Sequence, residues 1–404
     1  MKITIIGGGA AGLSAAILLA PYFPVTVLEG EDRIGKKLLT TGNGRCNLTN
    51  KYINVNRYHG SNKEFIESIL EQKGREDTID FFHSLGLSTV EESNKLYPVT
   101  LQASSVINVF LQELNHLGVK VHTKEKVLSI QKREKQFIIN TRENTYTSDI
   151  VILATGGKTA PKTGSDGSGY ALVKSLGHHV TKTFPALVQL KAKSPYLKHL
   201  KGTKVVTTVK LYLEDELVQE KEGELLFTDY GVSGPPILDH SRKAIEGLQE
   251  GKKVEIEFSL LNHITENGKK EIEEIFYRKY DRSLIEFLTG ILHKKFHQPL
   301  LKELQIKQGT NCFELEGRKK EQLFSRLFAS KLEITGHLQE KHAQVTCGGV
   351  PGKELTSSCE SKILPGLFIL GELIDVDGDC GGFNLQWAWS TAMVAASKII
   401  EQKI

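Results

Sequence analysis

The chain has 404 residues, with 52 Lys+Arg against 48 Asp+Glu, 39% hydrophobic residues and 5 Cys. This composition argues against a disordered chain, and about 150 residues per domain predicts two or three domains. The formal charge of +4 gives no strong field for nucleic acid or anionic lipid. The five cysteines are widely separated, which argues against a disulfide framework or a zinc site.

The N-terminal segment is apolar from Ile3 to Ala20, but several glycines interrupt it. A signal-peptide core does not require such glycines, and no other apolar run approaches the roughly 20 residues of a membrane span. We therefore expect a cytoplasmic protein without a membrane segment.

The first residues predict a strand, a helix and a second strand, at Lys2–Ile6, Ala10–Ala20 and Val25–Glu29. The sequence GGGAAG at positions 7–12 matches GxGxxG, whose glycines allow a tight turn, close approach of a pyrophosphate and packing of helix against strand. Glu29 ends the second strand, where a carboxylate can accept hydrogen bonds from ribose hydroxyls. The predicted dinucleotide-binding residues are Gly7, Gly9, Ala10, Ala11, Gly12, Glu29 and Gly30.

A polar, glycine-rich loop follows from Gly30 to about Tyr58. Its basic stretch GKKLLTTGNGRCN is suited to wrap the far side of a long cofactor, which favours FAD over NAD, although a solvated loop is the alternative. Cys46 is a candidate reactive thiol if Arg45 lowers its pKa, and simple packing is the alternative role. Further candidate cofactor-binding residues in this loop are Lys37, Thr41, Gly42 and Gly44.

The middle of the first domain alternates helices with short strands. Helices are predicted at Lys63–Leu85 and Ala103–Leu117, and strands at Val119–His122, Lys126–Ile130, Gln136–Asn140 and Ile150–Ala154. The last strand runs into ATGG, where glycine lets the backbone approach a cofactor, or where the chain simply turns. Ala154, Thr155 and Gly156 are the candidate cofactor-binding residues there.

From about Leu187 the pattern changes to antiparallel-looking strands, such as Thr203–Leu213 and Lys253–Ser259, and the segment 265–304 is helical and strongly charged. Within this insert, the sequence FTDYGVSGP offers Tyr230 or Asp229 as a proton donor, with a structural turn as the alternative. Acidic residues are interleaved with the basic clusters of the insert, which favours a solvated face over a nucleic-acid surface.

The C-terminal segment returns to glycine-rich turns, with a buried strand at Leu367–Leu370 and a final helix near Phe383–Ile400. The N-terminal amides of that helix are able to stabilise negative charge on a reduced flavin. Candidate cofactor-binding residues here are Gly371, Glu372, Gly382, Phe383 and Asn384. The alternative of a calcium loop made by Asp375, Asp377 and Asp379 is disfavoured because no Glu closes an EF-hand loop.

These motifs together resemble a known family. The segments IIGGGAAGLSAA, GKKLLTTGNGRCNLTN, LFTDYGVSGPPIL and GELIDVDGDCGGFNLQWAW are similar to the bacterial FAD-dependent oxidoreductases of the aminoacetone-oxidase-like family, which includes bile-acid-reductase relatives. The resemblance implies an α/β fold with a Rossmann-like FAD domain of the glutathione-reductase type, interrupted by an insert with a mixed β-barrel and a small helical portion. It also implies that Arg45, Cys46 and Asn47 lie near the flavin and that the backbone of Val127 contacts the adenine.

The domain boundaries that follow are 1–187 and 345–404 for the FAD-binding domain, and 188–344 for the insert, with its helical portion at about 265–304. We expect noncovalent FAD and no metal. The oligomeric state stays open.

The expected activity is exchange of a hydride between flavin N5 and a small organic substrate, with NAD(P)H as a transient donor or O₂ as an acceptor. Alternatives are a C=C reductase or dehydrogenase of the fumarate-reductase type, suggested by ATGG and PKTGSDGSGY, a tRNA-modifying flavoprotein, and a flavin sensor without catalysis. The expected partner is a small molecule, with neither nucleic acid nor membrane.

Overall fold

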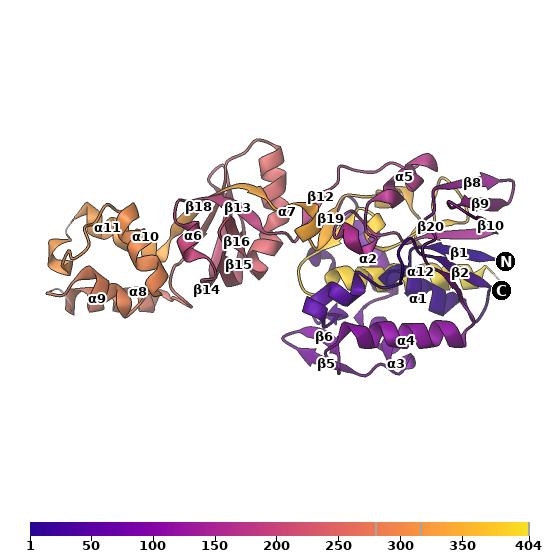
Figure 1. Ribbon diagram of the computed structural model, residues 1–404, viewed down its shortest axis with the longest axis horizontal. Helices are drawn as coiled ribbons and strands as arrows, with labels where there is room; N and C mark the ends of the chain where they lie inside the picture. Colours follow the sequence, from indigo (N-terminus) through magenta and orange to yellow (C-terminus); the bar gives the residue numbers. More distant parts are fainter. Residues whose placement is uncertain (279–280, 316, 403–404) are drawn as a thin grey trace. The chain divides into compact units, whose positions relative to one another are not determined.

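The computed structural model describes residues 1–278, 281–315 and 317–402. The chain forms two compact units, and Figure 1 shows their elements by label. Unit 1 comprises Met1–Pro185 and Glu340–Ile404, and unit 2 comprises Ala186–Gln339. Both ends of the chain therefore belong to unit 1, and unit 2 is an insertion; the sequence placed that insertion at 188–344.

A parallel sheet forms the centre of unit 1, in the order β20-β11-β1-β2-β7. Its strands are β1 (Ile3–Ile6), β2 (Val25–Leu28), β7 (Lys120–His122), β11 (Ile150–Leu153) and β20 (Leu367–Ile369). Ile3 pairs with Ile150 on one side and with Val25 on the other. The strands β1, β11 and β20 are buried along their whole length, as expected for a parallel sheet covered on both faces.

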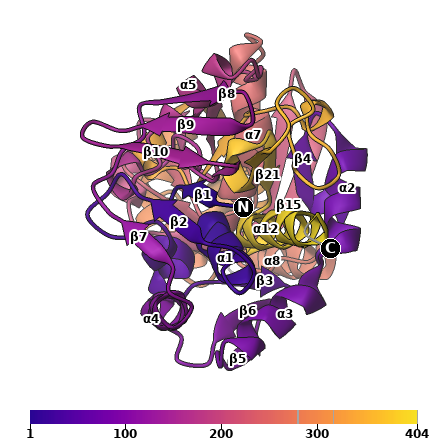
Figure 2. The same cartoon turned by 90° about the vertical axis from the view of Figure 1, so that its right-hand side faces the viewer.

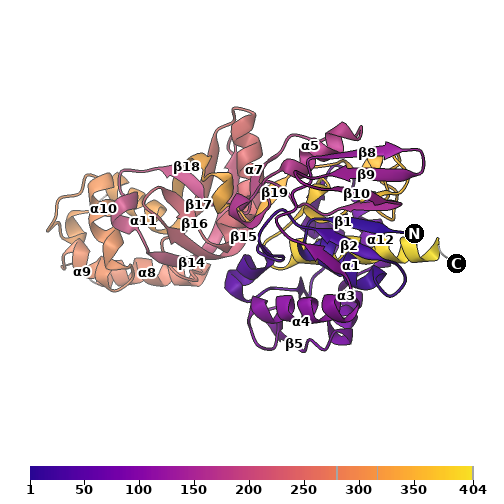
Figure 3. The same cartoon turned by 45° about the vertical axis from the view of Figure 1, so that its right-hand side comes forward.

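Helices cover one face of this sheet and a small antiparallel sheet covers the other. Helices α1 (Ala10–Leu19) and α12 (Phe383–Glu401) pack against each other, as Figure 2 shows. The antiparallel sheet β10-β9-β8 lies on the opposite side of the parallel sheet (Figure 3). Its strands are β8 (Ser129–Arg133), β9 (Gln136–Asn140) and β10 (Thr145–Ser148).

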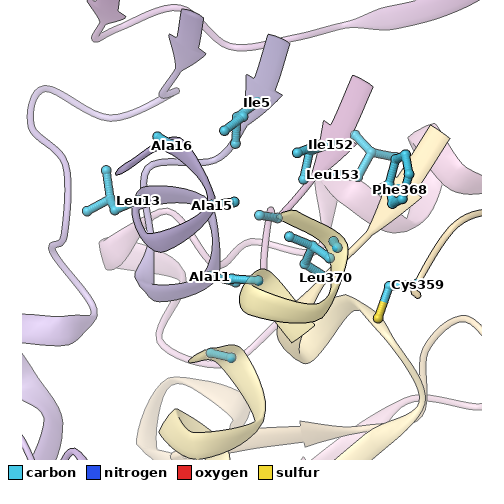
Figure 4. Close-up of a cluster of buried hydrophobic side chains, with 14 of the residues drawn as sticks. Ile5, Ala11, Leu13, Ala15, Ala16, Ile152, Leu153, Cys359, Phe368 and Leu370 are labelled. Carbon is cyan, nitrogen blue, oxygen red and sulfur yellow. The ribbon is translucent and has the colours of Figure 1, made fainter. Parts of the chain in front are cut away.

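Part of the core of unit 1 lies between the first helix and the parallel sheet. Ala11 and Ala15 point from α1 toward Leu370 at the end of β20, while Ile152 and Phe368 lie on the neighbouring strands (Figure 4). These small α1 side chains allow the helix to approach the sheet and α12 closely. The close packing fixes the helix start at the edge of the sheet.

The other regular elements of unit 1 flank this core. Its further helices are α2 (Lys63–Gln72), α3 (Arg75–Ser84), α4 (Ala103–His116) and α5 (Ser168–Ser175). Its further strands are β3 (Thr49–Asn50), β4 (Tyr58–Gly60), β5 (Thr89–Glu92), β6 (Lys95–Pro98), β12 (Phe184–Ala186), β19 (Val345–Cys347) and β21 (Val376–Gly378).

Unit 2 is built around a closed barrel in the order β13-β16-β15-β14-β17-β18. Its strands are β13 (Leu190–Lys193), β14 (Lys204–Leu213), β15 (Glu216–Phe227), β16 (Gly231–Ser233), β17 (Val254–Phe258) and β18 (Ser330–His337). Buried and accessible residues alternate along β17 and β18, as expected for strands with one face in the barrel core.

The helices of unit 2 lie in three segments. Helix α6 (Leu197–Leu200) precedes β14, and helix α7 (Pro235–Gln249), between β16 and β17, packs on the barrel. Between β17 and β18 lie α8 (Glu266–Arg278), α9 (Leu284–Thr289), α10 (His297–Glu303) and α11 (Arg318–Phe328). None of the helices in the described part of the chain combines the length and apolar character that crossing a membrane requires.

The predicted α/β fold with an inserted barrel and helical portion is confirmed, but three local predictions are wrong. The single helix expected at Lys63–Leu85 is interrupted, because Lys73 is extended and Gly74 caps α3 with help from Asp77. The strand expected at Lys126–Ile130 begins only at Ser129.

The helical portion also extends beyond the predicted 265–304. Helix α11 continues it to Phe328, since Gly317 starts another amphipathic helix.

Candidate functional site

The predicted cofactor residues of unit 1 gather at the carboxyl ends of the parallel strands. Gly7 follows β1, Glu29 follows β2, Ala154 follows β11, and Gly371 comes shortly after β20. The strand β1 lies between β2 and β11. The connection after β1 leads to β2 on one side, and the connection after β11 leads to β20 on the other side of the sheet. In open α/β sheets, ligands bind at such a switch point, outside the carboxyl ends of the strands.

The three motif glycines meet very different surroundings. A Cβ at Gly7, whose φ is +109°, would lie 2.4 Å from the Ala154 carbonyl oxygen, and one at Gly12 would lie 2.0 Å from the Gly7 carbonyl oxygen. A Cβ at Gly9 would meet nothing within 4 Å. Gly7 and Gly12 therefore serve close packing, whereas Gly9 borders open space at the start of α1.

The start of α1 presents backbone donors to that space. Gly9 is the N-cap residue and supplies no side-chain cap, and the bond from Leu13 N to the Gly9 oxygen is the first of the helix. The N–H groups of the first turn, including those of Ala10 and Ala11, have no partner within the helix. Such groups and the helix dipole suit a phosphate.

Glu29 is held at the end of β2 by backbone donors. Its carboxylate accepts hydrogen bonds from Gly8 N at 2.7 Å and Glu31 N at 2.8 Å. Burial raises the pKa of Glu29 above its usual value, although the hydrogen bonds from Glu31 and Gly8 oppose this shift. A partly buried carboxylate without a cationic partner among the described residues suits hydroxyl donors such as those of a ribose.

Val127 lies beside the same strand end. The segment after β7 is tied to the end of β2 by bonds from Glu29 N to the His122 oxygen and from Glu125 N to the Glu29 oxygen. Gly30 faces Lys126, whose side chain would lie 3.6 Å from a Cβ at Gly30. Val127 is buried in this segment, and the contact of its backbone with adenine stays a prediction.

Lys37 and Glu372 join distant parts of unit 1. The Lys37 ammonium lies 2.6 Å from the Glu372 carboxylate and 3.1 Å from Thr159 Oγ1. Glu372 also accepts hydrogen bonds from Thr159 Oγ1 at 3.1 Å and from Thr346 N at 2.9 Å. The two predicted residues are therefore each other's partners in one polar cluster.

The sequence prediction missed Thr159 and Thr346. Thr346 Oγ1 also accepts from Lys158 N and Thr159 N, at 2.8 and 3.2 Å, so it holds the turn after β11. No local motif marks Thr346, because its role arises only from the segments that pack around it. The PKTGSDGSGY segment, which follows Thr159, was the nearest available signal.

The turn after β11 is close to the first glycine loop. Gly156 has φ of +72°, and its Cβ position would lie 3.0 Å from Ser165 Oγ and 3.9 Å from the Glu372 carboxylate. The buried Thr155 Oγ1 has no hydrogen-bond partner among the described residues. A buried hydroxyl without a partner suits a polar ligand.

The GNGRCN loop contains tight backbone turns. Gly42 and Gly44 have positive φ values of +56° and +84°, and Thr41 anchors the turn by donating to the Leu38 oxygen at 2.7 Å. Arg45 pairs with Glu92, and its guanidinium lies 4.3 Å from the centroid of the Tyr97 ring.

Cys46 is fully buried in this loop, and its side chain is not activated by Arg45. Burial raises the pKa of the Cys46 thiol to about 12, and a hydrogen bond with Thr41 opposes the shift only in part. The neighbouring Arg45 forms its ion pair with Glu92 instead. These contacts favour the packing role of Cys46 over a reactive thiol.

The loop rests on the beginning of α12. Asn50 donates to the Gly381 oxygen at 2.8 Å, Thr49 donates to Gln386 at 2.6 Å, and Trp389 donates to the Leu48 oxygen at 2.9 Å. These bonds join the segment after GNGRCN, near the N-terminus, to the glycine-rich turn and helix near the C-terminus.

Asn47 carries an unpartnered acceptor at this junction. The buried Asn47 Oδ1 has no hydrogen-bond partner in the described chain, and a Cβ at Gly382 would lie 2.8 Å from it. Gly382, with φ of +101°, caps α12 without a side-chain bond. The unpartnered oxygen and the free helix start therefore lie beside each other.

Two other predicted residues have supporting contacts. The Asn384 side chain donates to the Gly378 oxygen at 2.8 Å and accepts from Gly378 N at 2.9 Å. Phe383 is buried, with its ring 6.0 Å from that of Tyr58. Both residues hold the turn before α12, so their direct contact with a cofactor stays a prediction.

The calcium alternative for this turn does not fit its contacts. Asp379 lies 3.0 Å from the Arg57 guanidinium and 2.9 Å from His59 Nε2. Within residues 1–278, 281–315 and 317–402, no cluster of His, Cys, Asp and Glu is arranged to hold a metal ion.

The proton-donor candidates belong to unit 2. Asp229 is exposed and lies 2.7 Å from the Lys201 ammonium, whose hydrogen bond lowers the pKa of Asp229 below its usual value. Asp229 is therefore ionised near neutral pH and is a poor general acid. Tyr230 is half-buried in the turn before β16 and stays a candidate.

Comparison with known proteins identifies the family. Residues 1–398 match the family described as the HI0933-like protein Rossmann domain. The chain is also 39% identical to the 3-dehydro-bile acid Δ(4,6)-reductase of Clostridium scindens, covering 99% of each chain. It is 30% identical to the ribosomal RNA dihydrouridine synthase of Escherichia coli, covering 99% of this chain and 98% of that protein.

A solved structure shows the same fold at much lower identity. The 3-ketosteroid Δ1-dehydrogenase of Sterolibacterium denitrificans is 11% identical, with a TM-score of 0.52 and coverage of 99% of both chains. This similarity concerns the fold alone.

Proposed function

Since this chain belongs to the HI0933-like protein Rossmann domain family and is an FAD-dependent oxidoreductase, we propose that it reduces a carbon–carbon double bond conjugated to a carbonyl group. One observation carries the proposal: two full-length relatives are named for reactions of this kind. A 3-dehydro bile acid with a Δ4 bond is an enone, and dihydrouridine is uridine whose double bond beside a carbonyl is saturated.

The residues of unit 1 fit FAD. Two buried acceptors or donors, Asn47 Oδ1 and Thr155 Oγ1, have no partner in the described chain, and Gly9 leaves open space before α1. The start of α1 would hold the pyrophosphate, and Glu29 would bind the ribose. Bound FAD supplies two-electron hydride chemistry.

Other residues keep this site assembled. The Lys37–Glu372 ion pair links the loop after β2 to the segment after β20. Asn50 and Thr49 join the GNGRCN loop to α12. These contacts preorganise the site from both ends of the chain.

The cysteines disfavour a reaction through a dithiol. None of the five forms a disulfide bond, and Cys46, Cys312, Cys347 and Cys359 are buried, while Cys380 is partly exposed. A flavin-linked disulfide reductase needs two neighbouring reactive thiols, and buried thiols with raised pKa values are poor nucleophiles. Electrons are therefore proposed to pass directly between flavin and substrate.

The complete reaction needs a reductant and a proton. NAD(P)H is proposed as a transient donor of two electrons and one proton, since the sequence has no second GxGxxG unit to hold it. In the net reaction NAD(P)H is oxidised to NAD(P)⁺, and the alkene gains a hydride at one carbon and a proton from water at the other; bound FAD would relay the hydride. Binding of FAD is proposed to be noncovalent.

The test is anaerobic reoxidation of the reduced holoenzyme by rapid-mixing absorption. The protein is reduced with one equivalent of NADH or NADPH and mixed with a steroid 4-en-3-one, with the saturated 3-ketone as the matched control. We expect the oxidised flavin spectrum to return with the enone and not with the ketone. Equal rates for both compounds would overturn the proposal.

Uridine in RNA is a second candidate substrate. Its C5=C6 bond is conjugated to a carbonyl, and the Escherichia coli relative that is 30% identical to this chain is named for the reaction at this base in ribosomal RNA. The same reoxidation experiment with a uridine-containing oligoribonucleotide separates this candidate from the steroid-type enone.

A further inference from the structure

Two distant segments of unit 2 bring lysines together on one surface. Lys198 and Lys201 lie in and after α6, while Lys294 and Lys295 begin η4 (Lys294–Phe296). The Lys295 ammonium donates to the Lys201 carbonyl oxygen at 2.8 Å, which joins the segments directly. We call these four residues the lysine patch.

The patch rests on an apolar base. Leu197, Leu200 and Phe296 are 4%, 7% and 3% exposed, and the Phe296 ring lies 5.4 Å from that of Phe227. Gly202 N also donates to the Phe227 oxygen at 2.9 Å. The buried side chains anchor both segments to the barrel.

The lysine side chains themselves are exposed, as are the neighbouring His199 and His293. The apolar base below and the charged side chains above hold the ammonium groups at the surface of unit 2.

Carboxylates balance only a small part of this charge. Lys201 lies 2.7 Å from Asp229, and the charge of Lys198 also acts on that carboxylate. In the described chain, Lys198, Lys294 and Lys295 have no carboxylate within ion-pair distance. Four ammonium groups against one carboxylate leave three positive charges.

The other basic clusters of the insert are more nearly balanced. Lys269 pairs with Glu266 at 2.6 Å, and Arg326 pairs with Glu303 at 2.8 Å. Lys319 donates to the Leu304 oxygen. The lysine patch therefore differs from the solvated charged faces that the sequence predicted for this insert.

Aromatic side chains border the lysine patch. Tyr196 precedes α6, and Tyr230 directly follows Asp229, the ion-pair partner of Lys201. Both tyrosines are half-buried. Ammonium groups beside aromatic rings are the combination that binds single-stranded nucleic acid, through phosphates and stacked bases.

We propose that the lysine patch of unit 2 binds the phosphate backbone of RNA. The charges come from two chain segments and are spread over a surface, which suits a polymer with repeated phosphates. The proposal rests on the proposed function only in naming RNA as the substrate class, because binding is measurable without turnover. It differs from the sequence-based expectation of no nucleic-acid partner, and the binding experiment decides between the two.

The test is fluorescence anisotropy of a labelled single-stranded oligoribonucleotide of about 16 nucleotides with the full-length holoenzyme. The test variant is the double substitution Lys198→Ala and Lys294→Ala, whose side chains carry no ion pair. The control is Lys302→Ala with Lys307→Ala, which removes two exposed lysines from the helical portion of the same unit. Flavin absorbance and thermal unfolding show whether each variant is folded and loaded.

We expect the test variant to bind RNA about tenfold more weakly near physiological salt, with the slope of log K against log salt reduced by about 1.4. The control should bind like the native protein. Equal losses in both variants, or no loss in the first, would overturn the proposal. Binding to anionic phospholipid vesicles without binding to RNA would also overturn it.

Enone reduction is measured separately on the same proteins. An active enzyme that fails to bind RNA refutes the lysine patch while leaving the proposed reaction intact. If the protein binds RNA but reduces neither an enone nor uridine, the proposed reduction is refuted, and RNA binding by the lysine patch still holds.

Discussion

Gly9 and Gly12 lie one turn apart in the same motif but carry different constraints. A side chain at Gly12 collides with the Gly7 carbonyl oxygen, whereas a side chain at Gly9 enters the space before α1. Gly9 therefore leaves room for a ligand, whereas Gly12 allows the helix to pack closely against the turn after β1.

We expect Gly9→Trp to yield a folded protein without flavin colour, because the indole fills the space proposed for the pyrophosphate. Gly12→Ala should instead lower the free energy of unfolding by about 1–3 kcal/mol through overpacking. Thermal unfolding of the apoproteins and the visible absorption spectrum separate these effects. Retention of FAD by Gly9→Trp would remove the first motif from the proposed site.

Cys46 illustrates how a thiol beside an arginine in sequence can be unreactive. Its pKa of about 12 leaves almost no thiolate at pH 8, and only Cys380 among the five cysteines is partly exposed. We expect a thiol reagent at pH 8 to modify Cys380 rapidly and the buried cysteines only after unfolding. Mass spectrometry of tryptic peptides identifies the sites, with Cys380→Ser as the control. Rapid labelling of Cys46 would contradict its burial.

At the scale of elements, α7 is joined to the barrel through a buried histidine. His240 Nε2 donates to the Val209 carbonyl oxygen of β14 at 3.0 Å, so that nitrogen carries the proton of the neutral ring. The buried Nδ1 has no partner in the described chain. Burial lowers the pKa of His240 from its usual 6.5 to about 4, and the charges of Lys221 and Lys243 add to this shift.

This contact predicts a pH dependence of stability. Between pH 6.5 and about 4 the unfolded chain binds the proton and the folded chain does not, so the free energy of unfolding falls as pH decreases. The full shift corresponds to about 3 kcal/mol. His240→Gln keeps a donor but cannot titrate, so its unfolding in denaturant should lose this part of the pH dependence. An unchanged profile would show that His240 is not the cause.

The Gln386 side chain connects the segment after the GNGRCN loop with α3 and α12. Gln386 accepts from Thr49 and donates to the Gly74 oxygen, Thr78 and Ser390, all within 3.0 Å. One buried amide thus holds the loop, the start of α3 and the last helix. The break between α2 and α3 places the Gly74 oxygen where Gln386 can reach it.

At the scale of the whole molecule, each unit has its own core. The cluster around α1, α12 and the parallel sheet lies entirely in unit 1, while the barrel strands bury their own apolar side chains in unit 2. Every predicted FAD-binding residue lies in unit 1, and the lysine patch lies in unit 2.

We therefore expect two transitions in calorimetric unfolding of the apoprotein. Free FAD at about 100 times its Kd should stabilise only the unit 1 transition, by about 2.7 kcal/mol. At pH 5, His240→Gln should shift only the transition that FAD leaves unchanged. That result would assign this second transition to unit 2, which contains His240. A single transition that responds to both changes would show that the units unfold cooperatively.

The sequence by itself determined the class of fold and the family. The glycine motif, the acid after β2 and the final helix depend on local backbone geometry and on short-range patterns, so they are readable without tertiary contacts. The same patterns gave the elements around them to within a few residues, except where Gly74 interrupts a helix and where β8 begins late. The individual contacts of the site residues with FAD stay predictions.

Only the tertiary structure decided which charges and polar groups meet. Lys37 pairs with Glu372, Arg45 pairs with Glu92 and not with Cys46, and Lys295 donates to the Lys201 carbonyl oxygen, which joins the two segments of the lysine patch. Burial and ion pairing depend on segments that can lie hundreds of residues apart, and spacing along the chain does not encode them. The pKa of Cys46, the ionisation of Asp229 and the lysine patch all follow from such long-range packing.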